Sequence, residues 1–139
     1  MKQLLRWPLA LLLGVVLALG LIAASPQQAS AGVNGGSVVN KTNHNITVWC
    51  DYGNEKTKHT LKPGQDSEAW SRCRLDTDQA RDAKKACITV SGLGAIYKRV
   101  NGTWQVPAGR KIKVVGVSTV RYYEWTKKKC GGKKNYPLK

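Results

Sequence analysis

The last third of the chain combines most of its positive charge with aromatic side chains. Between residues 110 and 139 there are ten Lys and Arg residues and one acid, Glu124, so this segment holds +9 of the formal net charge of +15. Cations attract anionic groups, and aromatic rings stack on bases or sugar rings. We therefore expect this segment to bind a polyanion or anionic surface: a cell-wall polymer, a glycan, a nucleic acid or an anionic membrane. The residues predicted to make the contacts are Lys111, Arg121, Tyr123, Trp125, Lys127, Lys128, Lys129, Lys133 and Lys134, with Trp104 as a further stacking side chain.

Other interpretations of this pattern stay open. Surface cations can serve only to keep a protein in solution, in which case they bind nothing. The tryptophans can equally be core side chains, because Trp is highly buried on average. A protein of another class also fits: a secreted inhibitor or toxin-like effector that blocks a protein target through a disulfide-held, charged loop at residues 74–86.

His44 and His59 are the residues that could perform catalysis. Two imidazoles and a lysine can cleave RNA by acid–base chemistry, which requires both rings to reach one phosphate. The sequence places His44 in an Asn-rich turn and His59 in an edge strand, with nothing that brings them together. Motifs typical of hydrolases, metalloproteases and nucleotide-binding enzymes do not occur. We therefore predict a protein that is not an enzyme and has no cofactor.

Three aspartates between residues 76 and 82 invite comparison with a calcium-binding loop. An EF-hand loop needs Gly at its sixth position and Glu at its twelfth, where this chain has Arg81 and Cys87. Acids at the start of the segment 76–86 and lysines near its end are instead typical of a helix. We expect one short helix there, capped by Asp76 or Thr77, and no metal site.

Four cysteines without a CxxC pair predict two disulfides rather than a zinc site, since zinc ligands usually come in close pairs. Four cysteines allow three pairings. We favour the pairs Cys73–Cys87, which would close a short charged loop, and Cys50–Cys130, which would tie the basic tail to the body.

The N-terminal segment has the order of a secretory signal peptide. Two cations precede an apolar run of 16 residues at 9–24, and small residues at 29 and 31 precede the expected cleavage after Ala31. The alternative is an uncleaved membrane anchor, but a span needs about 20 apolar residues. We therefore expect a secreted, extracellular monomer with three parts: a signal peptide at 1–31, a β domain at 32–125, and a loose basic tail at 126–139 tied by Cys130.

The composition after residue 31 predicts an all-β domain. Val and Ile total 15 and Thr adds 9, against 4 Leu, and side chains branched at Cβ favour strands over helices. Six to eight short strands with at most one short helix predict a small disulfide-stapled sandwich or barrel. The elements expected most clearly are an alternating strand at 45–51, an edge strand at 56–61, a turn at 91–94, a hairpin of 95–100 and 103–106 around Asn101-Gly102, and a strand-like segment at 111–125 broken near Gly116.

Overall fold

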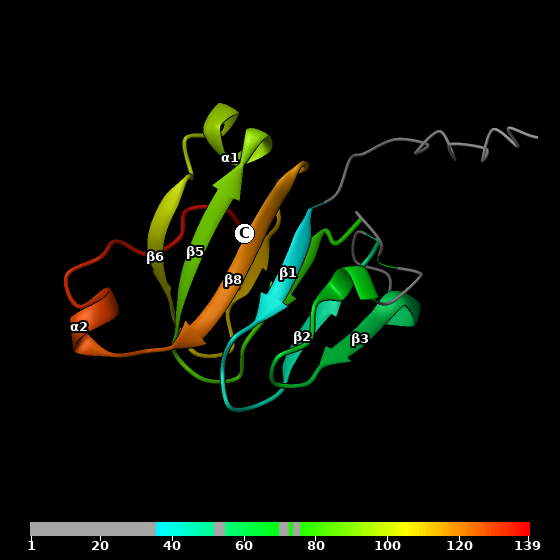
Figure 1. Cartoon of the computed structure of the whole chain (residues 1–139), viewed down its shortest axis with the longest axis horizontal. Helices are drawn as coiled ribbons and strands as arrows, with labels where there is room; N and C mark the ends of the chain where they lie inside the picture. The colour runs from blue at the N-terminus through cyan, green and yellow to red at the C-terminus, as the bar shows by residue number, and fades with distance from the viewer. Residues whose placement is uncertain (1–35, 52–54, 70–72, 74–75) are drawn as a thin grey trace, which may run out of the picture. The chain divides into compact units, whose positions relative to one another are not determined.

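The computed structural model describes residues 36–51, 55–69, 73 and 76–139 (Figure 1). All of the described residues lie in the unit 32–139. The expected signal peptide therefore lies outside the described residues.

The described chain forms eight strands in two four-stranded sheets, so the all-β prediction is confirmed and a sandwich is consistent with the arrangement. The strand order is β1-β8-β5-β6 in the first sheet, here called sheet 1, and β3-β2-β4-β7 in sheet 2. Sheet 2 is antiparallel throughout. The strands are β1 (Ser37–Asn40), β2 (Ile46–Trp49), β3 (Lys58–Leu61), β4 (Gln79–Arg81), β5 (Ala86–Gly92), β6 (Gly102–Val106), β7 (Lys111–Lys113) and β8 (Ser118–Glu124).

Sheet 1 has a parallel pair at one edge, where β1 lies beside β8. Its register joins Ser37 to Thr119 and Val38 to Val120, so the first described strand pairs with one that comes some eighty residues later. The longest ladder is antiparallel and joins β5 to β8, from Ala86↔Glu124 at one end to Gly92↔Ser118 at the other.

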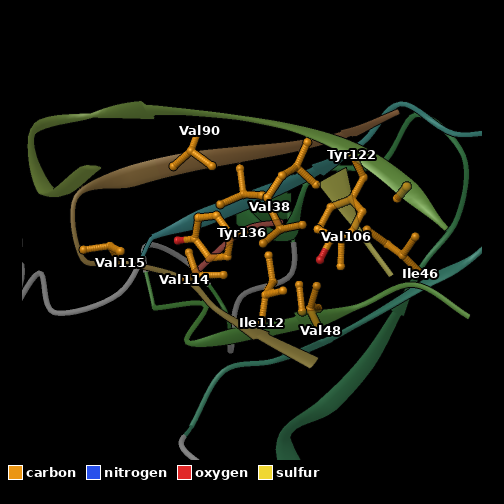
Figure 2. Close-up of a cluster of buried hydrophobic side chains, with 14 of the residues drawn as sticks. Val38, Ile46, Val48, Val90, Val106, Ile112, Val114, Val115, Tyr122 and Tyr136 are labelled. Carbon is orange, nitrogen blue, oxygen red and sulfur yellow. The ribbon is translucent and has the colours of Figure 1, made fainter. Parts of the chain in front are cut away.

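The core consists mainly of β-branched side chains from both sheets. Along β8, the buried Val120 and Tyr122 alternate with the partly exposed Arg121 and Tyr123. This period of two assigns one side of sheet 1 to the core and the other to solvent. Figure 2 shows Tyr122 and Val38 from sheet 1 facing the side chains of sheet 2, with Tyr136 among them.

Two predicted elements near the middle of the chain are wrong. The segment expected to be a helix at 76–86 contains β4, which is hydrogen-bonded to β2 on one side and β7 on the other. Ala80 in its centre is completely buried, so packing against neighbouring strands overrides the helix-like charge pattern. This segment is therefore not the exposed, disulfide-held loop that the inhibitor hypothesis requires.

The expected hairpin around Asn101-Gly102 is also wrong. The helix α1 (Leu93–Tyr97) occupies half of the predicted turn and half of the predicted first strand, and β6 pairs with β5 instead. The break predicted near Gly116 and the edge strand β3 are confirmed. Short helical elements complete the described fold: η1 (Glu55–Thr57), η2 (Ser67–Ala69) and α2 (Lys127–Cys130).

The favoured disulfide pairing is wrong, although all four cysteines are bonded. Cys50, which follows β2, pairs with Cys73 at a Cα–Cα distance of 4.9 Å. Cys87 on β5 pairs with Cys130 at the end of α2, with their Cα atoms 5.8 Å apart. Sequence spacing could not distinguish these pairs from the alternatives, because the pairing depends on which strands become neighbours.

The C-terminal segment is packed on the domain and is not a loose tail. Tyr136 is completely buried, and its hydroxyl donates a hydrogen bond of 3.1 Å to the carbonyl of Lys113. Its backbone N–H donates to the carbonyl of Gln105, and the carbonyl of Leu138 accepts from the N–H of Lys113. The segment thus contributes a large aromatic side chain to the core between the sheets.

Candidate polyanion-binding surface

A single turn of helix presents three of the predicted lysines at the end of sheet 1. Helix α2 begins after Thr126, whose hydroxyl caps it by accepting a hydrogen bond from the N–H of Lys129. The lysines of α2 are exposed, whereas Cys130 is completely buried in its disulfide with Cys87. Cys87 points to the solvent-facing side of sheet 1, so its disulfide with Cys130 fixes α2 against that side.

Helix α2 contacts an aromatic side chain of β8. The Nζ atom of Lys129 lies 3.1 Å from the centroid of the Tyr123 ring, which is a close cation–π contact. Arg121 is two residues before Tyr123 and on the same side of the strand, where it donates a hydrogen bond of 3.1 Å to the hydroxyl of Ser91. The fold thus brings together Arg121, Tyr123, Lys127, Lys128 and Lys129, and we call these five residues the basic strip.

Two further predicted lysines, at 133 and 134, lie beside β6 at the edge of the same sheet. Cys87 is opposite Tyr123 on one side and opposite Gln105 of β6 on the other. Gln105 is hydrogen-bonded to the C-terminal segment. Its backbone N–H donates to the carbonyl of Lys134, and its side-chain amide donates to the carbonyl of Lys133. The cations at 133 and 134 therefore lie beyond β6, three strand spacings or about 14 Å across the sheet from Tyr123.

A second cation–π pair lies at the same end of sheet 1. Lys85 places its Nζ atom 4.0 Å from the centroid of the Trp125 ring. The pairing of Ala86 with Glu124 makes Lys85 and Trp125 neighbours in the ladder. Sequence reasoning missed Lys85, because only the register of β5 against β8 places it beside a residue forty positions later.

Two predicted contact residues lie away from the basic strip. Trp104 is on the inner side of β6, where its indole N–H donates to the carbonyl of Val100 and its ring packs edge-on against Tyr136 at 6.1 Å. It is a core side chain and not an open stacking platform. Lys111 belongs to sheet 2, and its Nζ atom lies 4.0 Å from the ring centroid of the buried Trp49.

One of the two histidines links the sheets through carboxylates. His44 follows β1, and its ring nitrogens lie 2.8 Å from Asp82 and 2.9 Å from Glu124. A hydrogen bond from the backbone N–H of Asn43, followed by the charge and hydrogen bond of His44, lowers the pKa of Glu124. His59 lies on β3 opposite Val48, so the structure gives the two histidines separate surroundings.

The aspartates of the suspected calcium loop are separated by the fold. Asp82 faces His44, whereas burial and then the charges of Asp76 and Asp51 raise the pKa of Asp78 to about 6. The pKa of Asp76 is also raised, first by burial and then by Asp51. Within the described ranges, no three His, Cys, Asp or Glu side chains are placed to hold a metal ion.

Comparisons of the chain with protein-family models, with curated proteins and with solved structures find no match. In the part of the chain that the structure describes, no helix is long and apolar enough to cross a membrane.

Proposed function

We propose that this protein is a small secreted domain that binds an anionic polymer through the basic strip, without a chemical step. The observation that carries the proposal is the contact of Lys129 with Tyr123, held in place by the Cys87–Cys130 disulfide. An ordered cation beside an aromatic face suits a chain that alternates anionic groups with sugar rings or bases. The two disulfides are in keeping with an oxidising, extracellular environment.

The chemistry of the strip is one of position and charge. Arg121 offers a planar, forked set of donors that matches sulfate, phosphate or carboxylate oxygens. Lys127 and Lys128 are exposed and supply compact charges at the adjacent turn. Each neutralised anionic group releases a counterion, so the affinity must fall steeply as the salt concentration rises. We expect the protein to act as a monomer, because the strip lies on one chain.

The test uses heparin and single-stranded DNA as probes, with binding constants measured over a series of salt concentrations. The strip variant carries Lys127→Gln, Lys128→Gln and Lys129→Gln. We expect the slope of log affinity against log salt to decrease by about two to three units in this variant. A preference for DNA over heparin would identify bases as the stacked groups.

The matched control removes the same charge elsewhere, with Lys41→Gln, Lys62→Gln and Lys139→Gln. These three lysines are exposed and lie outside the strip. We expect their removal to change the slope by less than about one unit, through long-range electrostatics alone. If the control variant loses as much affinity as the strip variant, net charge explains binding and the proposed site is wrong.

A further inference from the structure

The end of sheet 1 opposite the basic strip carries a second, different surface. The ladder between β5 and β8 runs from Ala86↔Glu124, next to α2, to Gly92↔Ser118, next to α1. Figure 1 shows α1 and α2 at opposite ends of β5. Seven strand residues separate these ends by about 20 Å, so the lysines of α2 lie far from α1, whereas Arg121 bonds to Ser91 between the two ends.

Large apolar side chains gather at this end and remain exposed. Leu93 is 54% exposed, Ile96 59%, Tyr97 76% and Val117 48%. Within the described residues, these are the large hydrophobic side chains classed as exposed, and we call them the apolar apex. Scattered single exposures are ordinary, but a cluster at one tip is typical of a contact surface.

The apex is held rigidly by close backbone packing. The N–H of Gly94 points at the carbonyl of Val117 over 3.4 Å, and a Cβ atom at Gly94 would overlap the carbonyl of Gly116. Gly92 also approaches the backbone of Val117 so closely that a side chain would not fit there. These contacts join α1 to the turn before β8.

Val117 adopts a backbone conformation that valine rarely takes, with φ at 58°. The left-handed region is disfavoured for β-branched residues and is tolerated where the surroundings impose it. Glycine would relieve the strain at this position but would remove an apolar side chain that is half exposed to solvent. A strained, exposed valine is therefore more readily explained by a contact outside the domain than by packing within it.

The positively charged residues around the apolar apex favour an anionic partner. Lys98 and Arg99 follow Tyr97 directly and are both exposed. The sequence contains no acid from residue 83 to residue 123, whereas it contains eight Lys and Arg residues there. An apolar tip with an aromatic side chain and a cationic border matches the interfacial region of an anionic bilayer.

The backbone donors at the C-terminal end of α1 are already paired within the protein. The N–H groups of Lys98, Arg99 and Val100 donate to carbonyls within the same turn, over 3.1, 3.0 and 2.8 Å. Donors that are already paired do not have to be desolvated without compensation when the tip enters an apolar layer.

We propose that the apolar apex inserts shallowly into the surface of an anionic lipid bilayer, with Lys98 and Arg99 at the level of the lipid phosphates. This contact is distinct from polymer binding by the basic strip and involves none of its residues. The two surfaces would let one molecule hold a membrane at one end of sheet 1 and a polyanion at the other.

The test measures sedimentation of the full chain with vesicles of phosphatidylcholine alone and with vesicles containing equal parts of phosphatidylglycerol. The apex variant carries Ile96→Ser and Tyr97→Ser. We expect its partition to fall by about a hundredfold, since each buried apolar side chain contributes roughly tenfold. A Lys98→Gln, Arg99→Gln variant should lose about tenfold and most of its preference for phosphatidylglycerol. All variants share residues 1–35, so any contribution of that segment is common to them.

The controls separate this proposal from polymer binding. The strip variant should lose heparin affinity while it still binds vesicles through the apolar apex. The apex variant should lose vesicle binding and keep its heparin affinity. Unchanged circular dichroism and melting temperature would show that the apex variant is folded. Equal vesicle binding by the apex variant and the unmodified protein, or no binding to anionic vesicles at all, would overturn the proposal. Self-association that disappears in the apex variant, without vesicle binding, would identify a second copy as the partner and equally overturn it.

Discussion

The Nε2 atom of His44 lies 2.8 Å from Oδ1 of Asp82, a carboxylate that is completely buried at one end of the domain. The other ring nitrogen faces Glu124, which belongs to sheet 1, whereas Asp82 directly follows β4 of sheet 2. The ring thus lies between one carboxylate from each sheet. His44 therefore links the loop between β1 and β2 to both sheets.

Replacing His44 by alanine should destabilise the fold strongly. The change would leave Asp82 buried, with the N–H of Lys84 as the remaining hydrogen-bond donor to its Oδ1 atom among the described residues. Removing the hydrogen-bond partner of a buried polar group costs about 1–3 kcal/mol. Urea denaturation at neutral pH would measure the loss. The control is His59→Ala on β3, and a loss of the same size there would contradict the role assigned to His44.

Asp78 should make the protein less stable as the pH rises through its titration range. Its pKa is raised from 3.8 to about 6 in the folded state, first because of burial and then because of Asp76 and Asp51. The protonated acid is therefore favoured by folding, and this contribution is lost between about pH 4 and pH 6. Asp78→Asn should raise the free energy of unfolding at neutral pH by about 1–2 kcal/mol. Denaturation at a series of pH values would reveal a flatter profile for the variant, and an unchanged profile would exclude Asp78 as the cause.

Tyr136 should be essential for stability, although the sequence suggests a loose end. Tyr136→Ala would remove a completely buried aromatic side chain and should cost about 3–5 kcal/mol. Tyr136→Phe would remove only the hydrogen bond to the carbonyl of Lys113 and should cost about 1 kcal/mol. Thermal unfolding of both variants would test this order. Two small and equal losses would mean that the segment does not complete the core.

Breaking the Cys87–Cys130 bond should weaken polymer binding even though every lysine is retained. The double change Cys87→Ala, Cys130→Ala would release α2 from sheet 1 and disperse the basic strip. Closing a loop of 43 residues stabilises the fold by about 4 kcal/mol in the chain-entropy model. Peptide mapping would first verify the pairing, and a heparin titration below the melting temperature would then measure the affinity. Full affinity in the variant would show that the lysines act without the disulfide.

The alternation and the turn signals allowed part of the fold to be predicted. Val120 and Tyr122 face inward as their spacing requires, and the chain breaks near Gly116, where the apolar phase shifts. The false helix at 76–86 shows the limit of local signals. Its charge pattern resembles that of a helix, but two neighbouring strands pair with β4 and bury Ala80.

The sequence predicted which residue types make up the candidate site, but not how those residues are arranged in space. The charges and aromatic residues of the last third led to Arg121, Tyr123 and Lys129 as predicted contact residues, and the fold places Lys129 against Tyr123, two residues from Arg121. The contact of Lys85 with Trp125 depends on strand register, which no local pattern encodes. The inward position of Trp104 depends equally on register, since Trp104 is opposite the buried Ile88.

The parallel pairing of β1 with β8 has a consequence for the order of events during synthesis. When Ser37 leaves the ribosome, its partner Thr119 has not yet been made. The core also awaits Tyr136, which is added later still. Domains whose early segments pair among themselves can begin to fold while they are being made, but here β1 meets its neighbour β8 only when translation is nearly complete, and its earlier partner is the single bridge from Val39 to Asp66. We therefore expect sheet 1 and the shared core to form late, whereas β2 and β3, which are close in the sequence, can pair earlier.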